Sequence, residues 1–142
     1  MASVLPQGFG KYVLKQRLAV GGMAEIFLGD LEGDRGFSKR VVIKRILPHF
    51  SADPDFVAMF IDEACIAARL NHANVVQIYD FGSVDGAYYI AMEYVDGLDL
   101  RALMTGLGGK GSSLSPAQVA AIGESVARGL HHAHFIADEN GR

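Results

Sequence analysis

Residues 41–44 read Val-Val-Ile-Lys, so a lysine ends a run of apolar, β-branched residues that favours a strand. The run lies within a predicted strand over 40–47, which the proline at position 48 closes. On such a strand Val42, Lys44 and Ile46 share one face. A buried charge is costly unless it is paired, so this face predicts an acidic partner for Lys44.

A helix that follows supplies a candidate partner. Asp53 is a good N-cap and Pro54 suits the first helical position, so we predict a helix from there to about residue 70. Its apolar stripe has the spacings 4, 3, 4 and 3 and consists of Phe56, Phe60, Glu63, Ala67 and Leu70. The carboxylate of Glu63 therefore stands among apolar residues, and we predict that it pairs with Lys44. The alternatives are an edge-strand lysine that blocks sheet-to-sheet pairing and a solvated glutamate.

A glycine turn precedes both charges. Residues 18–26 read Leu-Ala-Val-Gly-Gly-Met-Ala-Glu-Ile, between a predicted strand over 12–18 and a returning strand over 25–29. On the first strand, alternation places Tyr12, Leu14, Gln16 and Leu18 on one face. Because glycine has no Cβ, backbone N–H groups in such a turn can approach phosphate oxygens. An ordinary hairpin turn is the alternative.

The remaining pattern describes more strands and then helices. Residues 1–10 read as a loose tail and 30–37 as a loop, while 75–81 and 87–94 read as two strands joined by an Asp85-Gly86 turn. After an interruption at 96–97, we expect a short helix over 99–104, a flexible loop over 106–113, and a last helix capped by Ser115 with an apolar stripe. That stripe is Val119, Ile122, Val126 and Leu130. Adjacent strands followed by helices predict an antiparallel sheet and an α+β fold.

Bulk composition narrows the function classes. The 142 residues suffice for a domain with a core, and 50% hydrophobic residues disfavour intrinsic disorder. The net charge is −3, and the sequence shows no basic patch of the kind that nucleic-acid-binding proteins usually have. The single Cys65 suits a reducing compartment, and we find no signal peptide and no apolar run of the roughly 18 residues that a membrane segment needs. These observations predict a cytoplasmic protein.

The order of glycine turn, strand lysine and helix glutamate resembles the N-terminal part of a bacterial, eukaryotic-like serine/threonine protein kinase. The resemblance covers about residues 10–135. Residues 18–27 look like that family's glycine-rich loop, 41–44 like its strand-lysine motif, 60–80 like its C-helix with the following strand, and 91–97 like its gatekeeper and hinge. It implies a kinase N-lobe over 11–94 with a five-stranded sheet and the C-helix, then a hinge and partial C-lobe over 95–142 with helices D and E.

The resemblance also implies roles for residues. Lys44 would contact the α- and β-phosphates of ATP, and Glu63 would hold Lys44 in place, which makes these two the expected catalytic residues. Met92 would be the gatekeeper. The expected ATP-binding residues are Leu18, Ala19, Val20, Gly21, Gly22, Met23, Ala24, Ile26, Val42, Lys44, Met92, Glu93, Val95 and Asp99.

Within that set the expected contacts differ. Three apolar side chains would pack on the adenine, namely Leu18, Ile26 and Val42. The backbones of Glu93 and Val95 would hydrogen-bond its edge, whereas Asp99 matches the position that often reaches the ribose.

The turn departs from the family pattern G-x-G-x-x-G-x-V. Ala19 and Ala24 replace the first and third glycines, and only Gly21 is kept. Because alanine costs about 1–2 kcal/mol in a left-handed conformation, we expect a stiffer or differently shaped turn. Val42 replaces the usual alanine before the isoleucine and lysine, which would narrow the adenine slot.

Two family motifs are absent from the 142 residues, the catalytic loop H-R-D-x-x-x-x-N and the metal-binding D-F-G. In the family the catalytic loop comes next after residues 138–142, so we interpret the chain as a kinase fragment that is inactive alone. The catalytic base and the Mg²⁺ ligands would lie outside it, and no metal ligand is predicted within it. The expected function is ATP binding in a kinase that phosphorylates protein substrates on Ser or Thr. The alternative is a non-catalytic, pseudokinase-like scaffold or regulator.

Two further patterns fail as sites. Residues 106–113 suggest a P-loop, but Met104 takes the place of the first glycine and Gly111 follows Lys110 where Ser or Thr is needed. His131, His132 and His134 suggest a metal site, but no spaced Cys or acidic ligands accompany them.

Overall fold

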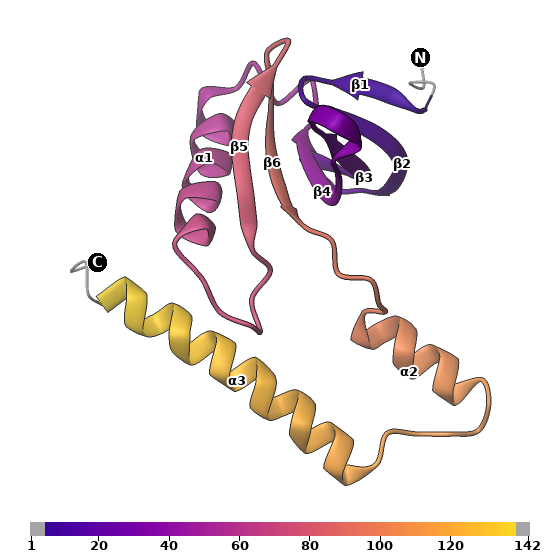
Figure 1. Ribbon diagram of the computed structural model, residues 1–142. Helices are drawn as coiled ribbons and strands as arrows, with labels where there is room; N and C mark the ends of the chain where they lie inside the picture. The colour runs from indigo at the N-terminus through magenta and orange to yellow at the C-terminus, as the bar shows by residue number, and fades with distance from the viewer. Residues whose placement is uncertain (1–4, 139–142) are drawn as a thin grey trace. The chain divides into compact units, whose positions relative to one another are not determined.

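The computed structural model describes residues 5–138, which fall into two compact units (Figure 1). The first unit comprises the chain up to Arg69 together with 76–94, and the second comprises 70–75 and the chain from Val95 on. Residues 1–4 of the predicted tail and 139–142 at the end of the predicted C-lobe segment lie outside the described residues. None of the described helices combines the length and the apolar composition needed to span a bilayer.

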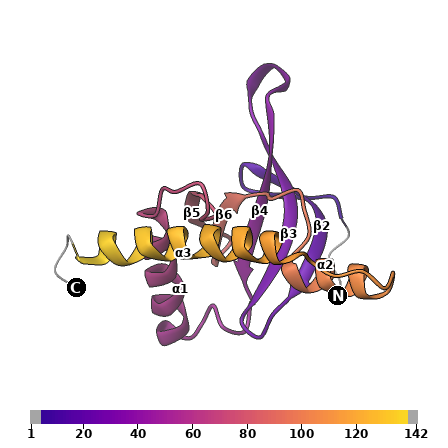
Figure 2. The same ribbon diagram turned by 90° about the horizontal axis from the view of Figure 1, so that it is seen from below.

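The first unit is an antiparallel sheet with one α-helix and a 3-10 turn at Asp34–Gly36, as an α+β fold requires. The sheet order is β1-β2-β3-β4-β6-β5, and Figure 2 shows the labels of the last five strands in that sequence across the sheet. The elements are β1 (Gln7–Phe9), β2 (Tyr12–Val20), β3 (Ala24–Glu32), β4 (Ser38–Ile46), α1 (Pro54–Ala68), β5 (Ile78–Val84) and β6 (Ala87–Glu93).

The sheet has six strands where five were expected, because part of the predicted loose tail is ordered as β1. Phe9 pairs with Tyr12 across the β1–β2 turn, and its side chain is only 5% exposed in the core. Burial of this ring against the sheet holds the short strand in place. The expectation of a loose tail through residue 10 was therefore wrong over Gln7–Phe9.

The alternation predicted for β2 holds only for its first half. Tyr12 and Leu14 are buried, whereas Gln16 and Leu18 are exposed. The pairing of β2 with β3 shifts register twice, between Leu14 and Gln16 and again beyond Arg17. Each bulge adds a residue to one strand and turns the following side chains to the other face, which a strict period of two cannot anticipate.

The two faces of the sheet carry separate cores. On one face the buried cluster is Phe9, Tyr12, Leu14, Phe27, Val41, Ile43, Tyr89 and Ala91. On the other face the buried cluster is Ala24, Ile46, Phe60, Ala64 and Ile90, and α1 contributes two of its members. Because β4 supplies residues to both clusters alternately, it is buried on both sides and positions side chains on either face.

Local signals set the ends of most elements. Asp53 accepts a hydrogen bond from the backbone N–H of Asp55 at 3.0 Å and caps α1, as predicted. Asp85 and Gly86 have φ of 51° and 79°, the left-handed pair that a tight β5–β6 hairpin needs. β5 begins at Ile78 rather than Val75 because residues 70–75 fold with the second unit.

The second unit contains two helices, α2 (Leu100–Gly108) and α3 (Pro116–Asp138). α2 extends into the predicted loop because Leu103 and Leu107, one turn apart, are both half-buried on one face. The backbone N–H of Gln118 donates to the hydroxyl of Ser115, which confirms the predicted cap of α3. The side-chain amide of Asn74 donates to the carbonyl of Ser125 at 2.7 Å and attaches the 70–75 segment to α3.

A polar cluster joins β2 to the β5–β6 hairpin. The hydroxyls of Tyr12 and Tyr89 donate to Oδ2 of Asp80 at 2.8 and 2.9 Å, and Nζ of Lys11 lies 2.9 Å from the same oxygen. Since β2 and β5 are not neighbours in the sheet, this carboxylate holds the curled sheet together.

The cluster shifts the pKa of each of its members. Burial raises the pKa of Tyr89 to about 12, and burial with the hydrogen bond to Asp80 raises the pKa of Tyr12 far above its usual range. Burial alone would raise the pKa of Asp80, but hydrogen bonds from Lys11, Tyr12 and Tyr89 outweigh it and lower that pKa below its usual value.

These shifts set two pH limits on stability. Because the folded pKa of Asp80 is lowered, its contribution is complete above the ordinary aspartate pKa of about 3.9 and is lost as pH falls through the lowered value. Because the folded pKa values of Tyr12 and Tyr89 are raised, their contribution is complete below the ordinary tyrosine pKa of about 10 and is lost as pH rises above it.

We predict that Asp80→Asn lowers the free energy of unfolding at neutral pH by about 1–2 kcal/mol, because three hydrogen bonds lose a charged acceptor. It should also flatten the loss of stability in acid. Urea unfolding across the pH range measures both. The exposed Asp34→Asn is the control and should change stability by less than about 0.5 kcal/mol. An acid profile of Asp80→Asn equal to that of the wild type would contradict the role of this carboxylate.

Candidate functional site

The register of three strands assembles one polar and three apolar side chains on the sheet face that α1 covers in part. Ile26 lies opposite Lys44 in the β3–β4 pair, and Val42 lies opposite Met92 in the β4–β6 pair. Directly opposed residues of antiparallel strands share a face, as do alternate residues of one strand. The sheet therefore brings together four of the predicted ATP-binding residues, and all four are half-buried.

The predicted ion pair between Lys44 and Glu63 is present. Nζ of Lys44 on β4 lies 2.5 Å from Oε1 of Glu63 on α1. The side chain of Lys44 is 25% exposed and that of Glu63 is 55% exposed. The pair thus joins the sheet to the helix at a partly hydrated position.

The expectation that Glu63 is buried was wrong. α1 turns Phe60 and Ala64 into the sheet, and Glu63 lies at the margin of that buried face. An ion pair at such an exposure contributes about 0–1 kcal/mol to stability. Its effect is therefore mainly on the placement of the Lys44 ammonium group.

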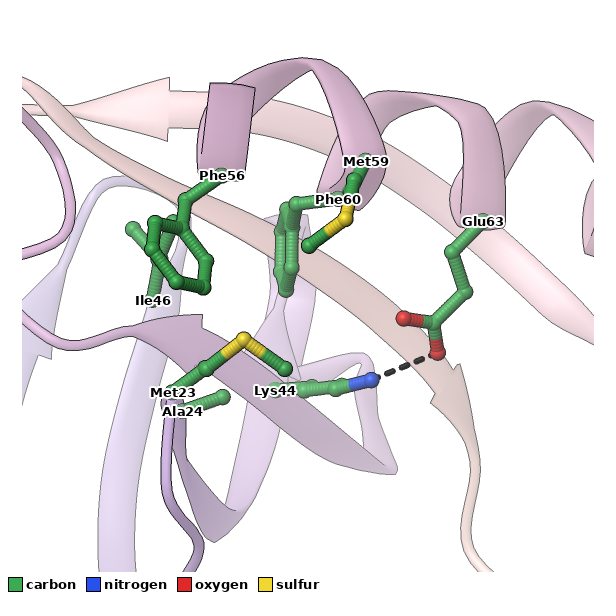
Figure 3. Close-up of a pocket in the computed structure, with 8 residues that line it drawn as sticks. All are labelled: Met23, Ala24, Lys44, Ile46, Phe56, Met59, Phe60 and Glu63. Carbon is green, nitrogen blue, oxygen red and sulfur yellow. Dashed lines mark hydrogen bonds and ion pairs between the residues drawn. The ribbon is translucent and has the colours of Figure 1, made fainter. Parts of the chain in front are cut away.

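A small cavity of about 90 Å³ lies beside this pair, between the glycine turn, β4 and α1 (Figure 3). Its lining is apolar apart from Lys44 and Glu63, and Figure 3 shows the side chain of Met23 next to Lys44. Nζ of Lys44 also lies 5.6 Å from the centroid of the Phe60 ring. The other lining residues are Ala24, Ile46, Phe56 and Met59. An apolar wall around one ion pair strengthens the electrostatic effect of the lysine on an anionic group nearby.

The glycine turn is shorter than the predicted loop. Ala19 and Val20 belong to β2, and Ala24 begins β3, which leaves Gly21, Gly22 and Met23 between the strands. The N–H of Gly21 donates to the carbonyl of Ala24 at 2.8 Å. The N–H of Leu47 donates to the carbonyl of Met23 at 2.9 Å and ties the turn to the end of β4.

The two alanines in the turn region carry no conformational strain. Within residues 5–138, Arg35 and Asp85 are the only non-glycine residues with positive φ. Ala19 and Ala24 have the extended backbone of the strands they belong to, so the expected left-handed penalty does not apply to them.

The fold does not itself require glycine at positions 21 and 22. Neither residue has φ in the left-handed region, and a Cβ at Gly22 would meet no atom within 4 Å. A Cβ at Gly21 would meet the carbonyl oxygen of Ala24 at 3.4 Å, an ordinary contact. The open surface over both backbones leaves room for the close approach of a ligand.

The hinge positions are divided between the two units. The N–H of Glu93 donates to the carbonyl of Gln77 at 2.9 Å, and the carboxylate of Glu93 accepts from the N–H of Gln77. Val95 and Asp99 belong to the second unit. There the carboxylate of Asp99 accepts from the N–H of Ala102 at 2.7 Å and caps α2, a role that the sequence did not suggest for it.

A charged cluster on the opposite face was missed in the sequence. Glu25 accepts from Arg45 and Arg17, and the side chain of Arg45 is only 14% exposed. A signal existed, because Arg45 shares its strand face with Val41 and Ile43, as Lys44 does with Val42 and Ile46.

Comparisons with known proteins relate most of the chain to protein kinases. A family profile described as "Protein kinase domain" matches residues 12–137. The tyrosine-protein kinase MasK of Myxococcus xanthus (strain DK1622) is 49% identical over 138 residues, which are 97% of this chain and 21% of that protein. The serine/threonine-protein kinase PrkC of Bacillus subtilis (strain 168) is 35% identical over 125 residues, 88% of this chain and 18% of that protein.

A crystal structure of the Mycobacterium tuberculosis PknI kinase domain superposes with a TM-score of 0.72 at 32% sequence identity. The match covers 95% of this chain and 53% of that one. The chain therefore spans about half of a solved kinase domain and about a fifth of the curated relatives it matches. Since the family profile covers most of its residues, the chain belongs to the protein kinase domain family.

Proposed function

We propose that this chain forms the ATP-binding part of a kinase that transfers phosphate to serine or threonine side chains of proteins. The observation that carries the proposal is the Lys44–Glu63 pair, which lies on the same sheet face as Ile26, Val42 and Met92. Three half-buried apolar side chains beside one positioned ammonium group suit a ligand with a flat base and a charged tail.

In this proposal apolar and charged residues bind different parts of ATP. The apolar face of Ile26 and Val42 packs on the adenine, and Lys44 offsets the negative charge of the phosphates that grows as phosphate is transferred. Glu63 acts through Lys44 by holding its ammonium group in one place. Because the N–H of Glu93 is already bonded to Gln77, its carbonyl is the group we assign to the adenine edge.

The glycine turn is assigned to the phosphates. Its open backbone allows the N–H of Gly22 to come close to phosphate oxygens, with Gly21, Met23 and the flanking Ala19, Val20 and Ala24 completing the set. Leu18 remains a prediction for the adenine. Val95 and Asp99 remain predictions for the adenine edge and the ribose. A cytoplasmic location is part of the proposal, because ATP is the proposed ligand.

Magnesium is the metal that the family uses with ATP. Among the described residues there is no group of three or more His, Cys, Asp or Glu side chains that could hold a metal ion, so no step is assigned to a metal bound by them. A non-catalytic scaffold that binds ATP is the second candidate, because the Lys44–Glu63 pair and the apolar face beside it account for binding of the nucleotide but supply no base for the substrate hydroxyl.

Phosphoamino-acid analysis can test whether the phosphate acceptor is a serine or threonine hydroxyl or a tyrosine hydroxyl. PrkC and other relatives are named serine/threonine kinases, whereas the 49% identical MasK is named a tyrosine kinase. We expect phosphoamino-acid analysis of the autophosphorylated protein to give phosphoserine and phosphothreonine. Phosphotyrosine alone would reassign the substrate class, and ATP binding without any transfer would favour the scaffold.

We predict that Lys44→Met, made in a protein with the complete kinase domain, lowers phosphate transfer by about 100-fold or more. Because the pair with Glu63 is partly exposed to water, its loss should lower the free energy of unfolding by less than about 1 kcal/mol. Transfer from radiolabelled ATP and urea unfolding measure the two effects. Lys15→Met, on β2, is the matched control and should keep wild-type transfer. Near-wild-type transfer by folded Lys44→Met would refute the role.

We predict that Met92→Gly lets the complete kinase domain bind ATP analogues with bulky groups on N6, which the wild type excludes. Met92 is half-buried beside the second core cluster, so its removal opens space behind the proposed adenine site. Competition binding with such an analogue measures the gain. Met92→Leu retains the volume and serves as the control. No gain for Met92→Gly would remove Met92 from the gatekeeper position.

We predict that residues 1–142 expressed alone transfer no phosphate and self-associate. The sequence contains no catalytic-loop aspartate, and Val119, Val126 and Leu130 on α3 are each 55% exposed. A transfer assay and light scattering measure both properties. Replacing Val126 and Leu130 with Gln should reduce the association without creating activity. A monodisperse, active monomer would show that this segment is sufficient for catalysis.

A further inference from the structure

Glu25 is the most deeply buried charged residue within residues 5–136, with 9% of its surface exposed. It is the second residue of β3 after the glycine turn, and it pairs with Val20 across the base of the turn. In the β3–β4 register it lies opposite Arg45, next to the position where Ile26 lies opposite Lys44. Its carboxylate therefore lies on the sheet face opposite to that of Lys44.

The carboxylate of Glu25 connects three strands. Oε2 accepts from Nη2 of Arg45 on β4 at 2.9 Å, and Oε1 accepts from Nη1 of Arg17 on β2 at 3.3 Å. Each oxygen thus binds an arginine from a different neighbouring strand. These are the strands that enter the glycine turn and that carry Lys44.

Arg45 is held in a fixed position by its surroundings. Its guanidinium carbon lies 4.8 Å from the ring centroid of Phe27 and 5.5 Å from that of Phe9 on β1. Nε of Arg45 is buried and has no hydrogen-bond partner among the described residues. A cation so enclosed needs its one close carboxylate, so Glu25 and Arg45 fix one another.

A second tie acts where the turn enters β3, because the carbonyl of Met23 accepts from the N–H of Leu47 just beyond β4. The β3 side of the turn is thus fixed to β4 at Met23 and at Glu25. Since β4 also carries Lys44, these ties determine how far the turn backbone stands from the Lys44 ammonium group.

We propose that Glu25 is a positioning residue for the phosphates of bound ATP. Together with Arg17 and Arg45 it holds the glycine turn at the distance from Lys44 that the phosphates require. This inference rests on the proposed function. It differs from a purely structural role because the turn is assigned to the phosphates, whereas the adenine face is formed by other residues.

The test compares ATP with adenosine, which has the same base and ribose but no phosphates, by calorimetric titration of a protein with the complete kinase domain. For Glu25→Gln we expect ATP affinity to fall about fivefold or more, which is the lower end of the range typical for energetic coupling between two sites. Adenosine affinity should be unchanged. Glu124→Gln is the matched control, because it removes an exposed ion pair with Arg128 in the second unit. It should leave both affinities unchanged.

A second variant keeps the test valid if Glu25→Gln does not fold. The side chain of Arg17 is 50% exposed, so Arg17→Gln can be made without burying an unpaired charge, and it should show the same selective loss on a smaller scale. Equal losses for ATP and adenosine, or no loss, in a protein whose wild type binds ATP would overturn the positioning role alone. A wild type that binds neither ligand would overturn both this role and the proposed function.

Discussion

The contact between Lys44 and Glu63 joins the sheet to the helix at the point where the proposed phosphate site lies. The contact matters for the position of the lysine rather than for stability, because an ion pair with a carboxylate that is 55% exposed adds little to the free energy of unfolding. Holding a flexible lysine in one place, however, spares the entropy of ordering it when a ligand binds. The burial of Phe60 and Ala64 places α1 against the sheet and so brings Glu63 within reach of β4.

β4 is central to the first unit because its two faces carry different charged groups. Lys44 belongs to the face of the candidate site, and Arg45 belongs to the opposite face, where Glu25 and two aromatic rings enclose it. Successive residues of one strand therefore connect the proposed phosphate site with the tie at the base of the glycine turn. A change in the twist of β4 would move both together.

The sequence allowed prediction of those features that depend on local pattern. A lysine in an apolar run and a glutamate at helical spacing predicted the ion pair, and Asp53 with Pro54 predicted the start of α1. The burial of Glu63 was mispredicted because the buried face of α1 continues from Phe60 to Ala64, one residue beyond Glu63. A helical stripe gives the buried side only to within about one residue.

Features that depend on the curl of the sheet could not be predicted in this way. In the Asp80 cluster, Tyr12 and Tyr89 come from strands far apart in the sequence. No local sequence pattern predicts that these strands approach one another. β1 is only three residues long, too short for a periodic signal. The bulges in β2 likewise arise from pairing with β3 rather than from the residues of β2 themselves. Arg45, by contrast, could have been found by applying the Lys44 argument to the other face of β4.

The most direct test of the account is a double-mutant cycle for phosphate transfer with Lys44→Met, Glu63→Gln and the double variant in a complete kinase domain. If Glu63 acts only by holding Lys44, each single variant loses activity and the double variant is no worse than Lys44→Met alone. Losses that multiply in the double variant would show that the two residues act independently, and would contradict the account.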